Sequence, residues 1–267
     1  MTGTKLTGAA APVITRLARL GFAAKGIVTI LIGALALRFA FGLGGGITGP
    51  RGAIGVLHNE PFGRTNLALL ATGLAGYALW MFVEAILDPE RKGASFQGLA
   101  ERVAFFVTGV GFALMAYATV NLLLGTAGNG TMGLDDLANI LLTPRLGRWS
   151  VGLVGAIVMT AGLLQIRLGI SAGFGHILQP MLSRLERLAV TTSGVVGYVT
   201  LGILSLMVGY SLVQVAVRYD PSRAGGWDDA LKLLAGLEQG RWLLGIVSAG
   251  LILYGFYFVL LMRYRAL

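Results

Sequence analysis

Six apolar stretches, each long enough to cross a bilayer as a helix, constrain this chain more than any other feature. The first, residues 20–41, reads LGFAAKGIVTILIGALALRFAF. About 20 apolar residues in a helix span the ~30 Å hydrocarbon core of a membrane. The other five stretches cover residues 65–87, 103–124, 149–170, 189–217 and 242–262. The sequence therefore predicts an all-α integral membrane protein with six transmembrane helices.

Composition excludes several classes of protein. Hydrophobic residues make up 55% of the chain and charged residues only 12%, more apolar surface than a water-soluble fold of this length could bury. Cysteine is absent and His58 and His176 are the two histidines, which argues against disulfides, thiolate metal sites and iron–sulfur clusters. The sequence has no nucleophile elbow, phosphate-binding loop or pair of carboxylates in a position where it could form a catalytic or phosphate-binding site. We expect no catalytic residues, no metal and no cofactor, and therefore no enzyme.

The six stretches repeat in pairs. An arginine seven residues before a glycine opens each odd stretch, as Arg19 does before Gly26, and a Gly-Arg dipeptide opens each even stretch. This repetition predicts one membrane domain, 1–267, built from three two-helix repeats at 14–92, 96–175 and 182–267. Because each repeat contains two spans, all three repeats enter the membrane in the same direction.

The connection inside each repeat has room for a short helix. Residues 227–235 place apolar side chains at helical spacing, with Asp228 and Asp229 in the first turn, where the helix dipole favours acids. Residues 134–141 repeat this pattern, and residues 52–57 show it weakly. We expect short interfacial helices between the two members of each pair, lying on the outer leaflet.

The net charge of +9 is explained by basic residues that flank the spans and meet anionic lipid. We therefore expect lipid as a partner and no nucleic acid. Of the 21 lysines and arginines, twelve fall on the side of the N-terminus and nine on the opposite side. This bias predicts a multi-pass protein of the bacterial inner (plasma) membrane with both termini in the cytoplasm.

Two charged residues fall inside the predicted spans. Lys25 lies about a turn and a half inside the first span and Glu84 about one turn from the end of the second. Because adjacent spans run antiparallel, the two side chains reach similar depths, and we predict an intramembrane ion pair between them. The alternative is that each charge extends separately to the headgroups, as long side chains near helix ends do.

Three arginines stand at helix starts, where the macrodipole disfavours a cation. For these residues we predict contacts to lipid phosphate, with Trp149 and Trp242 as the adjacent aromatic belt; they are Arg64, Arg148 and Arg241. The sharper alternative is a ring of three sites for an anionic substrate.

For the other polar and aromatic residues in the spans, a structural role is the simplest interpretation. We expect Asn121, Gln165 and Gln214 to form hydrogen bonds between helices, and closely spaced glycines to permit close helix packing. The aromatic residues of the last span are expected to face lipid or the interface, with a contact surface for a partner or pigment as the alternative; they are Tyr254, Phe256, Tyr257 and Phe258.

Three segments carry a family resemblance. RLGFAAKGIV at 19–28, EPFGR at 60–64 and GLAGYALW at 73–80 resemble the bacterial family catalogued as domain of unknown function 1206. The resemblance is strongest in the first repeat, clear at the start of the third and weaker in the second. It implies a membrane protein with three copies of a two-helix unit in a bacterial inner membrane. It implies no activity and no functional residues.

Glycine-rich packing surfaces, unbroken helices and the scarcity of buried chemistry favour a structural or accessory subunit that packs against another membrane assembly or a second copy of itself. A small-molecule or lipid transporter or channel is the alternative. Three two-helix repeats with a short helix in each connection also occur in the mitochondrial carriers, but the proline-acid-base signature of those carriers is missing here.

Overall fold

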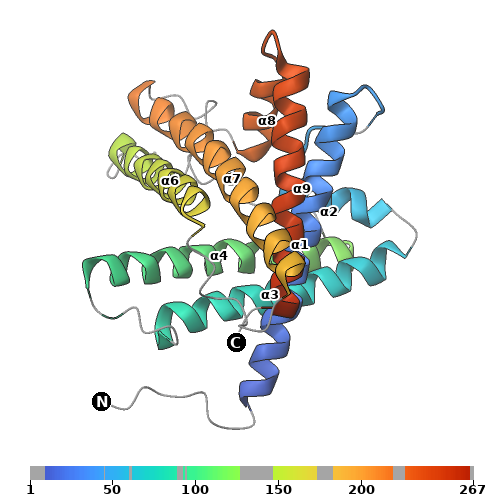
Figure 1. Cartoon of the computed structure of the whole chain (residues 1–267), viewed down its shortest axis with the longest axis vertical. Helices are drawn as coiled ribbons and strands as arrows, with labels where there is room; N and C mark the ends of the chain where they lie inside the picture. The colour runs from blue at the N-terminus through green and yellow to red at the C-terminus, as the bar shows by residue number, and fades with distance from the viewer. Residues whose placement is uncertain are drawn as a thin grey trace. The chain divides into compact units, whose positions relative to one another are not determined.

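The computed structural model describes residues 10–44, 46–59, 62–88, 93, 95–126, 147–172, 183–218 and 226–264. Within these ranges the chain is helical and contains no strand (Figure 1). The long helices are α1 (Ala10–Ala40), α3 (Gly63–Leu87), α4 (Phe96–Leu124), α6 (Gly147–Ile170), α7 (Arg184–Arg218) and α9 (Gly240–Tyr264).

Each of these six helices is long and apolar enough to cross a membrane. The candidate spans are Arg19–Ala40, Gly63–Leu87, Glu101–Leu124, Val151–Ile170, Arg184–Arg218 and Gly240–Arg263. They coincide with the six stretches predicted from the sequence. The Gly-Arg dipeptides mark the starts of α3, α6 and α9, as the repeat pattern predicted.

Local signals account for the ends of α4. Ser95 precedes its first turn, and the Ser95 hydroxyl accepts a hydrogen bond from the Gly98 backbone N–H at 3.1 Å. Gly125 ends the helix with a φ of 70°, a conformation that costs glycine little. The hydrophobic run between these two caps therefore forms one continuous helix.

Two short helices occupy connections between the spans. Helix α8 (Trp227–Ala235) confirms the helix predicted at 227–235 and buries Leu231 and Leu234 against the protein. Helix α2 (Pro50–Asn59) is longer than the weak pattern at 52–57 suggested. The apolar pattern of α2 is short, but two other features favour the longer helix. Pro50 suits the first position of a helix, and Ala53 is fully buried. The helix predicted at 134–141 lies outside the described residues.

The chain divides into two compact units, which are described separately. Unit 1 contains Met1–Ile27, Ile54–Gly128 and Phe258–Leu267. In this unit α3 and α4 lie side by side (Figure 1). A Cβ on Gly109 of α4 would lie 2.9 Å from the Phe82 ring of α3, so glycine allows this close approach.

Unit 2 contains Val28–Ala53 and Asn129–Tyr257, and within it α6 packs along α7. Glycines bring these two backbones together. A Cβ on Gly155 would lie 2.9 Å from the Gly209 carbonyl oxygen, and one on Gly202 would lie 2.7 Å from the Gly162 carbonyl oxygen. The prediction that glycine serves helix packing is confirmed at this interface.

The aromatic residues of the last span do not face lipid as a group, contrary to the prediction. Tyr254, Tyr257 and Phe258 are buried, and only Phe256 is substantially exposed. The reason within unit 2 is close packing of α9 on α7: a Cβ on Gly197 would lie 2.6 Å from the Tyr254 Cα. Tyrosine rings therefore fill the space between these helices.

Candidate functional site

Lys25 of α1 lies among aromatic side chains in unit 1. Its ammonium donates a hydrogen bond to the Tyr77 phenol oxygen of α3 at 3.1 Å. The same nitrogen lies 4.0 Å from the Phe258 ring centroid, 4.9 Å from that of Tyr77 and 5.4 Å from that of Phe112. These distances are within the range of cation–π attraction. We call Tyr77, Phe112 and Phe258 the aromatic cage.

Close backbone packing brings the cage to Lys25. A Cβ on Gly21 would lie 2.5 Å from the Tyr77 backbone nitrogen, so α1 and α3 touch one turn before Lys25. Phe22 packs edge-on against Tyr77 with a centroid distance of 5.5 Å. Tyr77 and Phe112 pack similarly at 4.6 Å. The cage thus belongs to a continuous aromatic cluster contributed by four helices.

Glu84 is 1% exposed and lies on α3 in the same unit as Lys25. Seven residues separate it from Tyr77, close to two helical turns, so both residues project from the same face of α3. The contact of Lys25 with Tyr77 is therefore on the same face of α3 as Glu84, about two helical turns away from it. The ion pair between Lys25 and Glu84 stays a prediction.

Arg102 is a structural residue whose contacts sequence reasoning missed. From the first turns of α4 its Nε donates to the Ala85 carbonyl at 2.8 Å and its Nη2 to the Ile86 carbonyl at 3.0 Å. These carbonyls belong to the last turn of α3, which lacks intrahelical donors and carries the negative end of the helix dipole. The arginine repeated at the start of each odd stretch was the available signal.

The structure describes the three arginines predicted to contact lipid phosphate to different extents. Arg64 and Arg241 are exposed in the first turns of α3 and α9, whereas the side chain of Arg148 lies outside the described part of the chain. The Arg241 guanidinium lies 5.5 Å from the Phe41 ring centroid, and Phe41 packs edge-on against Trp242. The aromatic neighbour predicted for Arg241 is present, and the phosphate contacts stay predictions.

Polar residues inside the spans form local hydrogen bonds. The Ser205 hydroxyl of α7 donates to the Gln165 Oε1 of α6 at 3.4 Å, which confirms the predicted hydrogen bond between helices for Gln165. Gln214 instead donates to the Tyr210 hydroxyl one turn away on its own helix, at 2.6 Å. The Thr126 hydroxyl donates to the backbone carbonyl of Asn121 at 3.3 Å, at the end of α4, and lies 3.5 Å from the Asn121 side-chain Oδ1.

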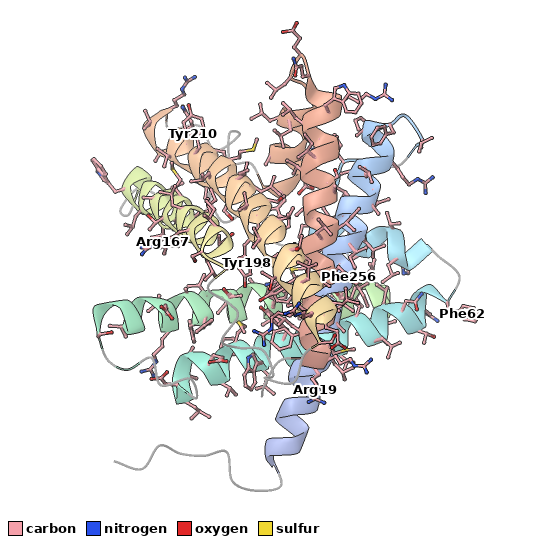
Figure 2. All side chains as sticks on the ribbon, viewed as in Figure 1. Arg19, Phe62, Arg167, Tyr198, Tyr210 and Phe256 are labelled. Atoms are coloured by element: carbon pink, nitrogen blue, oxygen red, sulfur yellow. The ribbon has the colours of Figure 1, made fainter. Side chains whose placement is uncertain are left out.

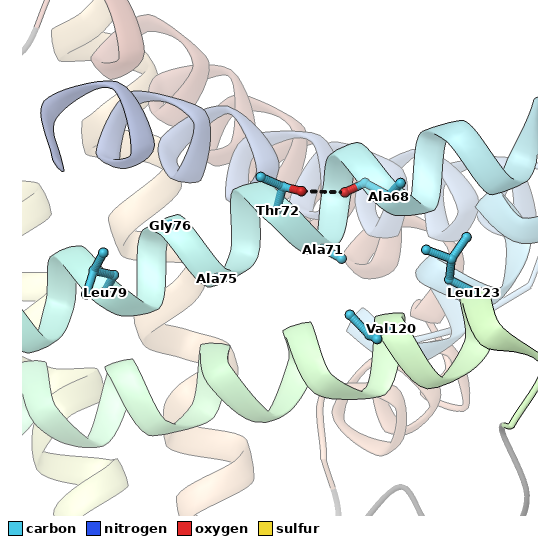
Figure 3. Close-up of a pocket in the computed structure, with 8 residues that line it drawn as sticks. All are labelled: Ala68, Ala71, Thr72, Ala75, Gly76, Leu79, Val120 and Leu123. Atoms are coloured by element: carbon cyan, nitrogen blue, oxygen red, sulfur yellow. Dashed lines mark hydrogen bonds between the residues drawn. The ribbon is translucent and has the colours of Figure 1, made fainter. Parts of the chain in front are cut away.

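An apolar groove opens between α3 and α4 in unit 1 (Figure 3). Its volume is about 470 Å³. It is lined by Ala68, Ala71, Thr72, Ala75, Gly76, Leu79, Val120 and Leu123. The Thr72 hydroxyl donates to the Ala68 carbonyl at 2.8 Å and is therefore satisfied within its own helix. The groove favours an apolar occupant.

The described residues contain no group of three or more His, Asp or Glu side chains that could hold a metal ion. His58 is exposed at the end of α2, and His176 lies outside the described residues.

Phe62, in the turn between α2 and α3, is 84% exposed (Figure 2). Such an exposed ring beside Arg64 suits a position at a membrane surface.

Comparisons with known proteins agree with the repeat pattern. The family model described as Domain of Unknown Function (DUF1206) matches three times, at residues 20–88, 103–172 and 196–265. Each match overlaps two of the six candidate spans.

One curated relative, the uncharacterized protein YxxB of Bacillus subtilis (strain 168), is 33% identical over 250 residues. The match covers 93% of this chain and 90% of the relative. No solved structure matches the chain. The chain therefore belongs to the DUF1206 family, with three copies of its two-helix unit.

Proposed function

We propose that this protein is a structural or accessory subunit of a membrane assembly in the bacterial inner membrane, with both termini in the cytoplasm. The observation that carries the proposal is a contrast between helix faces. Backbones are in direct contact at the α6–α7 interface, whereas α4 and α6 each bury only 17% of their most apolar segment. The inner faces are closely packed and the outer faces are free to meet lipid or another protein.

The exposed face of α4 is a continuous stripe. We define the α4 stripe as Val103, Phe106, Val107, Val110, Leu114 and Tyr117, all exposed. Their spacing of three and four residues keeps them on one side of the helix. The stripe includes two large aromatic side chains, a residue class enriched at protein interfaces. This composition supports a partner helix on α4.

Photo-crosslinking tests the proposal in the native membrane. A photoreactive residue at Leu114, in the α4 stripe, should capture one membrane protein that also accompanies the gently extracted chain at fixed stoichiometry. The same residue at Leu233 of α8 is the matched control, since the exposures are similar at 55% and 62%. Capture of lipid alone, together with a native mass of an unaccompanied monomer, would contradict the proposal.

A small-molecule or lipid transporter is the second candidate, and charged residues inside the membrane-spanning segments favour it. Lys25 and Glu84 both belong to such segments, and intramembrane charges often mark pathways for ions or substrates. Substrate-dependent flux into proteoliposomes that is lost on Arg64→Ala, Arg148→Ala or Arg241→Ala would support transport. Flux indistinguishable from protein-free vesicles would eliminate it for the substrates tested.

A further inference from the structure

The α3–α4 groove matches the length of one lipid acyl chain. Along α3 its lining runs from Ala68 to Leu79, eleven steps of 1.5 Å from one residue to the next and therefore about 16 Å. Half of the hydrocarbon core is about 15 Å thick. A groove of this length that begins near a helix end extends through one leaflet.

A basic residue stands at the membrane-surface end of the groove. Arg64 is exposed in the first turn of α3, one helical turn before Ala68. Steps of 100° per residue place Arg64 between Ala71 and Ala75 around the helix, so it projects from the side that bears the groove. The arginine therefore lies where the headgroup of a lipid in the groove would be.

We propose that the groove between α3 and α4 binds an anionic phospholipid, with one acyl chain against Ala71, Ala75 and Leu79 and the phosphate at Arg64. The lining is apolar, and the Thr72 hydroxyl is already bonded within α3. The guanidinium matches phosphate in charge and geometry. The site does not depend on the proposed accessory role, because it needs no second protein.

Lipid titration of the purified full-length chain, read by native mass spectrometry, tests the site. The probes are phosphatidylglycerol and phosphatidylcholine with the same acyl chains. We expect the wild-type chain to prefer phosphatidylglycerol, and Arg64→Ala to weaken that binding about five-fold, as one surface arginine would. Arg218→Ala, at an exposed arginine of α7, is the matched control and should retain the preference.

A second variant tests the acyl-chain part of the site. Ala75 is exposed in the groove, so Ala75→Leu should fill the space without disturbing the core and weaken binding of both lipids. Ala156→Leu on the exposed face of α6 is the control. Phosphatidylglycerol with a photoreactive acyl chain should label the peptide that contains Thr72 and Leu79.

Three results would overturn the proposal. The first is equal binding of the two lipids by the wild-type chain. The second is wild-type binding by both Arg64→Ala and Ala75→Leu. The third is that a protein helix, from a partner or a second copy, occupies the groove, so that the lipid probe does not label it. The last result would favour the accessory role while removing the lipid site, so the two proposals can fail separately.

Discussion

At the scale of single residues, the most informative contact is the one between Lys25 and Tyr77. A cation within a membrane span needs compensation, and the phenol oxygen together with three aromatic rings supplies part of it. Tyr77→Phe keeps the ring and removes the hydrogen-bond acceptor. We expect it to lower the free energy of unfolding in detergent by about 1 kcal/mol. Tyr117→Phe, at an exposed tyrosine of α4, should leave stability unchanged, and equal effects of the two changes would refute this role.

The predicted ion pair between Lys25 and Glu84 has its own test. Lys25→Met and Glu84→Gln should each destabilise the protein, and the double variant should lose less than the sum of the two. We expect a coupling energy above about 0.5 kcal/mol, as for residues in direct contact. Thermal unfolding of the four proteins measures it. Additive effects would show that the two charges act independently, and unchanged stability in both single variants would show that the pair contributes nothing.

Arg102 provides a test of helix-end capping. Arg102→Lys keeps the charge but cannot reproduce the two parallel bonds to the Ala85 and Ile86 carbonyls. We expect a loss of about 1 kcal/mol and faster amide hydrogen exchange in the last turn of α3. Arg187→Lys, at the matching repeat position but with an exposed side chain, is the control. Exchange in α3 that stays at the wild-type rate would argue against the cap.

Residue roles differed in how far sequence could predict them. The depth of Lys25 follows from counting residues within an apolar run. The aromatic cage does not, because Phe112 and Phe258 are far from Lys25 in the sequence and no local spacing rule relates them. Arg102 was visible as a repeated arginine, but its carbonyl partners depend on the packing of α4 on α3.

At the scale of helices, close packing through glycine accounts for the contact between α6 and α7. A Cβ on Gly209 would lie 2.7 Å from the Met159 backbone nitrogen and 2.8 Å from the Gly155 carbonyl oxygen. Gly209→Ala should therefore cost about 1–3 kcal/mol, because backbone must move. Gly111→Ala in α4 is the control, since its added methyl group meets nothing within 4 Å. It should be neutral or slightly stabilising in thermal unfolding, and equal losses at both sites would contradict the packing account.

The long helices were predictable because a membrane imposes a minimum apolar length, and each run exceeds it. The short helices were harder. Helix α8 has enough apolar side chains to show the helical spacing in the sequence, whereas α2 has few. In α2, burial of Ala53 and Ile54 supplies stability that the local helix propensity does not. Burial also explains the error over Tyr254 and Tyr257, since an aromatic residue in an apolar span suits either lipid or a helix interface.

At the scale of the whole molecule, the repeats were predictable from the spacing of Arg-Gly and Gly-Arg positions, and the three family matches agree with that spacing. The apolar groove was not predictable, because it depends on which small residues of α3 remain uncovered by α4. The proposed topology, six spans with both termini in the cytoplasm, requires that all three repeats cross the membrane in the same direction.

Single-cysteine labelling tests that requirement most directly, because the natural chain contains no cysteine. Cysteines replacing Lys92 and Ser183, which follow α3 and α6, should react with a membrane-impermeant maleimide only after the cells are opened. Cysteines replacing Gly46 and Glu238, which precede α3 and α9, should react in intact cells. This alternating pattern is the one that six spans with cytoplasmic termini predict. Labelling of Lys92→Cys and Gly46→Cys from the same side would contradict it.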